Sequence, residues 1–294
     1  MPRQLKFTVP QHFDGKPAKW FLKDYCTLST RMITQLKREN EGILMNGKIL
    51  RTIDPVTAGA EVVISLPHED SPFITPTKGE LNIVFEDEHL LIVNKPPYLP
   101  VHPVKQYQTD TLANYTAYYS KSRGESYVFR ALNRLDRNTS GLVMIAKDRF
   151  TVNKLKHRVE KTYYALVHGE LCGSGTVTAP IGLLPDSKIV RRVLSDGAPA
   201  ITHYEALCSS KEFSFIKLQL ETGKTHQIRC HMSSLGHPLL GDDLYGGSTA
   251  LIPRQALHCA EMTFCHPVTE ERLHLKTQLP EDMQKCVTDA FTRL

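Results

Sequence analysis

The sequence predicts an α+β fold made of two units: a small N-terminal α+β unit, and a larger unit built on a mixed or antiparallel β-sheet flanked by helices and loops. Short strand patterns recur beyond residue 80 without the regular alternation of strand and helix that a parallel sheet requires. A stretch rich in proline and polar residues, 69–79, is typical of a linker. Because 294 residues can bury more than one core, we expect units at residues 8–68 and 80–294.

The N-terminal unit is predicted from one helix, one hairpin and one strand. Ser29 can cap a helix over residues 30–38, where apolar side chains recur at helical spacing. Residues 43–50 form two short strand patterns around an Asn-Gly dipeptide, which favours a two-residue hairpin turn. Residues 61–66 have the pattern of a closing strand. Together they indicate a self-contained α+β module.

The larger unit is predicted from short apolar or alternating segments. Its last predicted strand, FIKLQL, alternates apolar and polar residues, as a half-buried strand should. The strands are expected at residues 83–85, 90–93, 142–146, 163–167 and 215–220, and helices at 111–120 and 151–160.

Composition and charge exclude several classes of protein. No apolar run approaches the roughly 20 residues that span a bilayer, and the N-terminus lacks a signal peptide, so a cytoplasmic protein without a membrane partner is expected. Seven cysteines occur without a Cys-x-x-Cys pair, which argues against a zinc ribbon or a disulfide framework. The net charge of +5 is mild, but residues 130–161 carry nine Lys or Arg against three Asp or Glu. Such a stretch is either a solvated surface or the footprint of a polyanion.

Common nucleotide and metal motifs are missing from the sequence. Gly223-Lys224-Thr225 resembles the end of a phosphate-binding loop, but Leu218 stands where that loop needs a glycine. There is no G-x-S-x-G, H-E-x-x-H or G-x-G-x-x-G string. We therefore expect any chemistry to be carried out by side chains, with no metal and no organic cofactor.

The segment NRLDRNTSGLVMIAKD places an aspartate among arginines just before a predicted buried strand. Arg130, Arg134 and Arg137 surround Asp136 in the sequence. The carboxylate is either a loop charge paired with Arg134, or a nucleophile or base held in place by the strand that follows. Candidate partners for an ionised Asp136 are Arg134, Arg137 and Arg229.

Four ordered segments of the larger unit resemble the RluA-type RNA pseudouridine synthases. The resemblance spans about residues 83–267 and implies the pseudouridine synthase fold. A shorter string, ALHCAEMTFCHP, extends it. The four segments are LIVNKPPYLPVHP, NRLDRNTSGLVMIAKD, KTYYALVHG and ETGKTHQIRCHMSSLGHPLLGDDLYGG.

The resemblance implies an enzyme that isomerises uridine in RNA, with Asp136 as the essential aspartate, Tyr163 stacked on the target uracil and Arg229 paired with Asp136. The reaction breaks the bond between ribose carbon 1 and uracil nitrogen 1, turns the base and rejoins it through carbon 5. Asp136 can attack the ribose, attack the base or deprotonate the ribose, and the sequence leaves these three open.

Residues 8–68 resemble the S-four-type RNA-binding domain, through the string LSTRMITQLKRENEGILMNGKIL. The resemblance implies that Arg31, Lys37 and Arg38 grip structured RNA. In the larger unit, the residues predicted to contact RNA are Lys95, Arg134 and Arg137.

The chain departs from the two family patterns at a few positions. Asn133 stands where the synthases usually have histidine, Tyr98 where they have glycine, and Cys259 where they have alanine. Ala60 replaces the usual aspartate of the S-four-type pattern. We expect Asn133 and Tyr98 to alter substrate contacts more than the chemistry of Asp136.

The substrate is expected to be ribosomal or transfer RNA, bound by a monomer. Two other classes of protein remain open on the sequence alone. One is an RNA-binding protein without activity, and the other is an N-glycosidase that cleaves the same bond without rejoining it.

Overall fold

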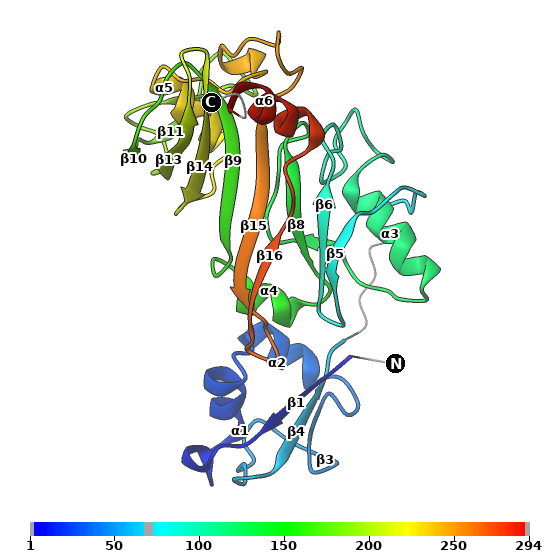
Figure 1. Cartoon of the computed structure of the whole chain (residues 1–294). Helices are drawn as coiled ribbons and strands as arrows, with labels where there is room; N and C mark the ends of the chain where they lie inside the picture. Colours follow the sequence, from blue (N-terminus) through cyan, green and yellow to red (C-terminus); the bar gives the residue numbers. More distant parts are fainter. Residues whose placement is uncertain (1–2, 68–72, 292–294) are drawn as a thin grey trace.

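The computed structural model describes residues 3–67 and 73–291, which form two units with separate hydrophobic cores (Figure 1). The N-terminal unit has a four-stranded antiparallel sheet in the order β1-β4-β2-β3, covered by short helices. Its elements are β1 (Gln4–Thr8), η1 (Gln11–Phe13), α1 (Ala18–Trp20), η2 (Phe21–Tyr25), α2 (Thr30–Leu36), β2 (Ile43–Met45), β3 (Lys48–Ile49) and β4 (Glu61–Ser65).

Local sequence signals correctly predicted a helix cap and a hairpin turn in this unit. The Ser29 side chain accepts a hydrogen bond from Met32 N at 3.2 Å and caps α2 as predicted. The Asn46-Gly47 turn joins β2 to β3 with both residues at positive φ, which confirms the hairpin. The N-terminal unit begins earlier than the predicted boundary at residue 8, because β1 pairs with β4 and so belongs to its sheet. Part of the linker predicted at 69–79 lies outside the described residues.

The larger unit is built on a ten-stranded mixed sheet. Its main path runs β10-β13-β14-β9-β15-β8-β6-β5, with β16 on β15 and β7 on β8. Strands β8 and β15 are parallel and the other pairs are antiparallel. The strands are β5 (Ile83–Glu86), β6 (Leu90–Lys95), β7 (Arg130–Ala131), β8 (Ser140–Ala146), β9 (Glu160–His168), β10 (Ser174–Thr178), β13 (Ile201–Ser209), β14 (Phe213–Leu220), β15 (Leu257–Cys265) and β16 (Arg272–Lys276).

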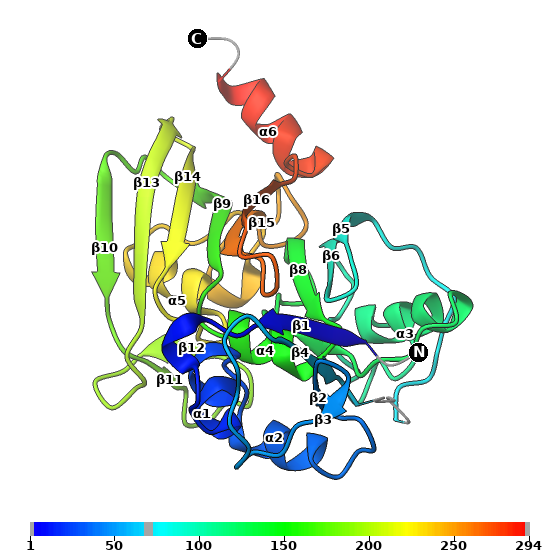
Figure 2. The same ribbon diagram turned by 90° about the horizontal axis from the view of Figure 1, so that it is seen from below.

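Helices and a small hairpin surround this sheet (Figures 1 and 2). The fold is therefore α+β with a mixed sheet, as the sequence predicted. No helix among the described residues has the length and apolar character needed to span a membrane. The remaining elements are α3 (Leu112–Ser122), α4 (Arg149–Leu155), α5 (Gln227–Ser234), η3 (Asp243–Tyr245), α6 (Glu281–Phe291) and the hairpin β11 (Ile181–Leu183) with β12 (Arg191–Val193).

The helix predicted at 151–160 is shifted and shorter in the structure. Asp148 caps it, because its side chain accepts a hydrogen bond from Thr151 N at 2.7 Å, and α4 begins at Arg149. The helix ends at Leu155, just before His157 takes a positive φ of 62°. The residues after Leu155, which were predicted to form the last turn of this helix, instead lead into β9.

The two units are packed together through α4. Phe150 is 1% exposed and is buried in the core of the N-terminal unit, with its ring 6.2 Å from that of Phe7. Arg3 Nη1 donates to Lys147 O at 2.8 Å across the same boundary. Figure 1 shows the N-terminal unit next to α4, at the lower end of the larger sheet.

Candidate active site

Asp136 lies in the loop between β7 and β8, at the start of a fully buried strand. Thr139 N donates to Asp136 O at 3.1 Å and closes the loop. Gly141 has φ 116°, and a Cβ there would lie 2.3 Å from Cys259 O, so only glycine lets β15 approach β8 this closely. The buried strand thus fixes the loop that carries the carboxylate.

Arg229 on α5 is paired with Asp136, as predicted. Its Nη1 donates to Asp136 Oδ2 at 2.9 Å. The Asp136 side chain is 27% exposed, whereas that of Arg229 is only 7% exposed. The structure therefore brings together two residues that lie 93 positions apart in the chain.

Asp242 holds Arg229 from the other side, and the sequence prediction missed it. Its two carboxylate oxygens accept hydrogen bonds from Arg229 Nε and Nη2, both at 2.7 Å. Burial alone would lower the pKa of Arg229, but the carboxylates of Asp242 and Asp136 raise it overall. The Arg229 guanidinium also lies over the Tyr245 ring, 4.9 Å from its centroid. Arg229 is therefore a fixed cation between two carboxylates.

Tyr163 on β9 lies beside this pair and is nearly buried, at 6% exposed. Burial raises the pKa of Tyr163 well above its ordinary value, and the nearby Cys259 and Asp136 act in the same direction. Tyr164 points to the opposite face of the sheet, where its hydroxyl donates to Glu261 at 3.0 Å. Of the two tyrosines, Tyr163 is thus the one on the side of Asp136.

His226 is a second neighbour of Asp136 that the sequence prediction missed. Its Nε2 lies 3.7 Å from Asp136 Oδ2, and its Nδ1 is 2.9 Å from the Tyr245 hydroxyl. Burial lowers the pKa of His226, and the charge of Asp136 opposes this shift. The residue has φ 57°, an uncommon conformation for a histidine that often marks functional sites. Both Asp242 and His226 lie in the fourth family-like segment, which was the available signal.

The prediction that Lys95 contacts RNA is wrong for this conformation, because the side chain is fully buried. Lys95 Nζ donates to Pro96 O at 2.8 Å and to Arg137 O at 3.1 Å. Burial and the charge of Arg254 lower the pKa of Lys95 to about 7, although the negative charge of Asp136 acts to raise it. Lys95 therefore supports the Asp136 loop from inside the protein.

The other predicted RNA-binding side chains lie on the surface. Arg137 contacts the Tyr107 hydroxyl, and its guanidinium lies 5.3 Å from the centroid of that ring. Arg134 is exposed two residues before Asp136. Exposed basic residues of the N-terminal unit are Arg31, Lys37 and Arg38.

Two of the departures from the family pattern have structural consequences. Asn133 accepts from Met144 N at 2.9 Å and donates to Leu142 O at 3.0 Å, so it joins the Asp136 segment to β8. Tyr98 has φ 65° and is 49% exposed. That conformation suits glycine, so the loop after Lys95 holds an exposed aromatic side chain in a strained backbone.

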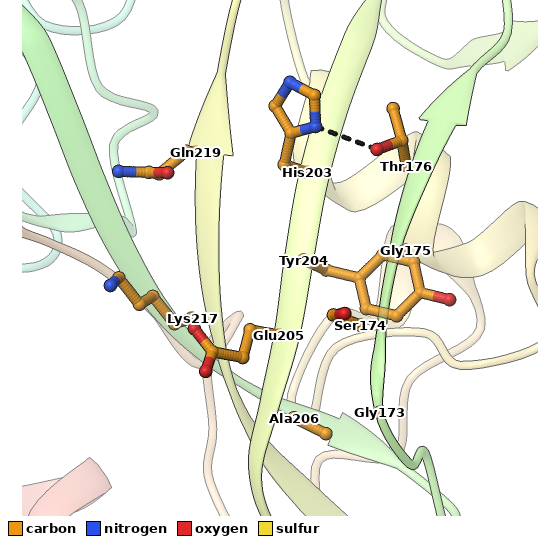
Figure 3. A pocket seen from close by; sticks show the side chains of 10 residues that line it. All are labelled: Gly173, Ser174, Gly175, Thr176, His203, Tyr204, Glu205, Ala206, Lys217 and Gln219. Atoms are coloured by element: carbon orange, nitrogen blue, oxygen red, sulfur yellow. Dashed lines mark hydrogen bonds between the residues drawn. The ribbon is translucent and has the colours of Figure 1, made fainter.

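A hollow of about 540 Å³ lies elsewhere, on β10, β13 and β14 (Figure 3). Lys217 and Gln219 line it, and they alternate along β14 with Leu218, which is opposite Tyr163 in the sheet. Alternation places Lys217 and Gln219 on the other face of the sheet from Tyr163. This hollow is therefore separate from the Asp136 site. In the described residues, no group of three His, Cys, Asp or Glu could hold a metal ion.

The fold of the chain is similar to that of a solved human pseudouridylate synthase domain protein. The human protein RNA pseudouridylate synthase domain containing 1 has a TM-score of 0.57 and 25% identity to this chain, covering 70% of this chain and 87% of its own. Residues 89–234 match the RNA pseudouridylate synthase family model.

Curated relatives identify the family. The uncharacterized RNA pseudouridine synthase YjbO of Bacillus subtilis is 39% identical over 88% of this chain and 94% of its own length. Ribosomal large subunit pseudouridine synthase D of Pseudomonas aeruginosa is 36% identical over 82% of this chain and 81% of its own. The chain belongs to the RNA pseudouridine synthase family, which confirms the enzyme class that its four segments predicted.

Proposed function

We propose that this enzyme converts specific uridines of large-subunit ribosomal RNA to pseudouridine, with Asp136 as the catalytic carboxylate. The observation that carries the assignment of Asp136 is its ion pair with Arg229 at 2.9 Å, beside Tyr163. Three relatives, at 34–36% identity, are named ribosomal large subunit pseudouridine synthase D, which supports ribosomal RNA as the substrate. Transfer RNA is the second candidate substrate.

The geometry gives each side chain a role in the reaction. Arg229 donates to Oδ2 of Asp136, orients the carboxylate and leaves Oδ1 as the oxygen that meets the nucleoside. That oxygen serves equally for attack on the ribose, for attack on the base or for deprotonation of the ribose. Tyr163 offers a ring on which uracil stacks, a contact worth roughly 1–3 kcal/mol.

The substrate supplies every atom of the product. The bond from ribose carbon 1 to uracil nitrogen 1 breaks, a bond from carbon 1 to carbon 5 forms, and the proton on carbon 5 leaves to solvent while nitrogen 1 gains one. The target nucleotide must first leave the RNA stack, at a cost of a few kcal/mol. Tyr98, which is exposed in the loop after Lys95, is proposed to contact the flanking nucleotides and to influence which uridine is accepted.

The protein is proposed to act as a monomer in the cytoplasm. Asp136, Tyr163 and Arg229 come from one chain, so a single copy completes the site. All seven cysteines are free thiols, as expected in a reducing compartment. Residues 8–68 are proposed to be the RNA-binding unit, with Arg31, Lys37 and Arg38 facing the substrate.

Carbodiimide mapping of pseudouridine in cells with and without the gene tests the substrate. We expect one or more sites in large-subunit ribosomal RNA to disappear and to return with the wild-type gene but not with Asp136→Asn. Loss of transfer RNA sites instead would assign the second candidate substrate. If no site changes, the proposed function is wrong. Release of free uracil by the purified protein would instead indicate an N-glycosidase.

A further inference from the structure

We propose that Arg254, held by Asp282 of α6, positions the loop that carries Asp136, an inference that rests on the proposed function. Arg254 Nη1 donates to Asn138 O at 3.2 Å, in the turn that directly follows Asp136. Its Nε and Nη2 donate to the two carboxylate oxygens of Asp282, at 2.7 and 2.8 Å. One guanidinium thus joins the Asp136 loop to the C-terminal helix.

The residues that follow Asp136, 137–140, are each held by a different buried side chain. The partners, in the order of these residues, are Lys95 at 3.1 Å, Arg254 at 3.2 Å, Gln255 at 3.3 Å and His258 at 2.9 Å. Each of these side chains belongs to a residue that is at most 5% exposed. The loop is therefore positioned from inside the protein, mainly by the segment 254–258.

The same segment also contacts the loop that carries Asp242. Ala256 N donates to Leu240 O at 2.8 Å. A Cβ on Gly241 would lie 2.0 Å from Arg254 O, so the two stretches of backbone are in direct contact there. The segment therefore fixes both loops whose carboxylates meet at the active-site arginine.

Asp282 compensates the charge of Arg254. The Arg254 side chain is fully buried, and a buried guanidinium that loses its carboxylate is left with an uncompensated charge. A second cation lies close by, because the charge of Arg254 is one of the causes that lower the pKa of Lys95. Two parallel hydrogen bonds to one carboxylate also fix the plane of the guanidinium. Without Asp282, Nη1 therefore loses its fixed direction toward Asn138 O.

Helix α6 is packed firmly enough to hold Asp282 in place. Met283 is fully buried in a cluster with Ile252 and Ala256, which lie on either side of Arg254 in the sequence. The carboxylate and the guanidinium thus share one packed core, which sets the distance between them. Figure 1 shows α6 at the end of the larger sheet opposite the N-terminal unit.

The test compares Asp282→Asn with two controls on the same helix. Asp282→Asn keeps the shape of the side chain and removes the charge, so that Arg254 loses its carboxylate. Glu281→Gln removes the same charge from the exposed neighbouring position. Val287→Ala removes packing of α6 against its core and leaves both charges in place. Steady-state tritium release from uridine-5-labelled RNA gives kcat and KM for each protein.

We expect Asp282→Asn to lower kcat roughly 10-fold with KM within about twofold of the wild type, because a displaced carboxylate loses rate while the RNA contacts remain. Asp282→Glu should restore most of the rate, since it keeps the carboxylate. Both controls should keep kcat within about twofold, even where Val287→Ala lowers the melting temperature as much as Asp282→Asn does. An unchanged kcat for Asp282→Asn, or an equal loss for Val287→Ala, would overturn the proposal, since the ion pair would then serve only the stability of α6.

Hydrogen exchange separates this proposal from the proposed function, because it needs no RNA. Thr139 N donates to Asp136 O at 3.1 Å and reports whether the loop is closed. This amide should exchange at least roughly fivefold faster in Asp282→Asn, and at the wild-type rate in both controls. Faster exchange in a protein that releases no tritium from any RNA would contradict the proposed function and leave the coupling of α6 to the loop intact. Wild-type exchange in Asp282→Asn, with normal tritium release by the wild type, would overturn the proposal alone.

Discussion

Arg229 connects the chemistry of the site to its architecture, because it contacts both carboxylates. Asp242 is 1% exposed and binds Arg229 through two oxygens, whereas Asp136 is partly open and binds through one. Charge-assisted hydrogen bonds of this kind contribute about 1.5–3 kcal/mol each. The pair with buried Asp242 thus fixes the guanidinium, and the Asp136 side chain stays partly open to solvent.

Asp242→Asn is expected to lower kcat with little change in KM, because Asp242 acts on Asp136 through Arg229 and does not touch RNA. Breaking a buried ion pair should also lower the free energy of unfolding by about 3 kcal/mol. Steady-state tritium release and urea unfolding measure the two effects. The neighbouring exposed Asp243→Asn is the control and should change neither quantity. A rise in KM alone would show that Asp242 contacts the substrate.

Lys95 predicts a pH dependence of stability. Between about pH 7 and 10.5 the unfolded chain keeps the Lys95 proton that the folded protein has released, so the unfolded state binds more protons. The free energy of unfolding should therefore rise with pH in this window, by up to about 1.4 kcal/mol per pH unit.

Urea unfolding at pH 7, 8 and 9 tests this dependence by comparing the wild type with Lys95→Met. The wild type should gain stability over Lys95→Met as the pH rises, while exposed Lys48→Met should follow the wild type. Parallel pH profiles for the wild type and Lys95→Met would show that Lys95 is not buried as a titrating group.

The sequence predicted the pairing of two site residues but missed the positions of two other charged residues near them. The pairing of Asp136 with Arg229 was predicted because both residues lie in strings with a known counterpart. Asp242 has no local signature, since its partner Arg229 is 13 residues away and is reached only through a turn of the fold. Lys95 looked like a surface charge because nothing in its neighbouring residues shows that β6 is covered on both faces.

At the scale of elements, helix α4 contributes buried side chains to the cores of both units. Its Phe150 completes the N-terminal core, while Leu155 belongs to the core of the larger unit. A seven-residue helix is too short to be stable alone, so packing on both sides maintains it. The placement of the N-terminal unit against the larger unit therefore depends on this helix.

Phe150→Ala is expected to cost about 3–5 kcal/mol and to loosen the N-terminal unit from the sheet. Limited proteolysis should then cut between the two units faster than in the wild type, while tritium release from a short stem-loop persists. Phe73→Ala, at a side chain that is 96% exposed, is the matched control and should leave the cleavage rate unchanged. Unchanged proteolysis of Phe150→Ala would mean that other contacts hold the units together.

Element boundaries were predictable where the signal is local. The Ser29 cap and the Asn46-Gly47 turn determine their own geometry, and both were found as expected. Strand β15 was not predicted, because it is defined by pairing with β8, whose Ser140 lies opposite His258, 118 residues along the chain. The start of α4 was missed because the capping role of Asp148 was not recognised.

At the scale of the whole molecule, the sheet separates two tasks. One end of β8 follows the loop that carries Asp136, which is paired with Arg229 from α5, and the other end leads to α4, whose Phe150 is buried in the core of the N-terminal unit. RNA bound along this length would be held by phosphate contacts while one uridine is turned out toward Asp136.

The most direct measurement of the central claim is tritium release from uridine-5-labelled ribosomal RNA by the wild type and Asp136→Asn, with RNA affinity measured in parallel. The account predicts that Asp136→Asn loses at least about 10³-fold in rate while it binds RNA within about threefold of the wild type. Retention of the wild-type rate by Asp136→Asn would contradict the assignment of the reaction to this carboxylate.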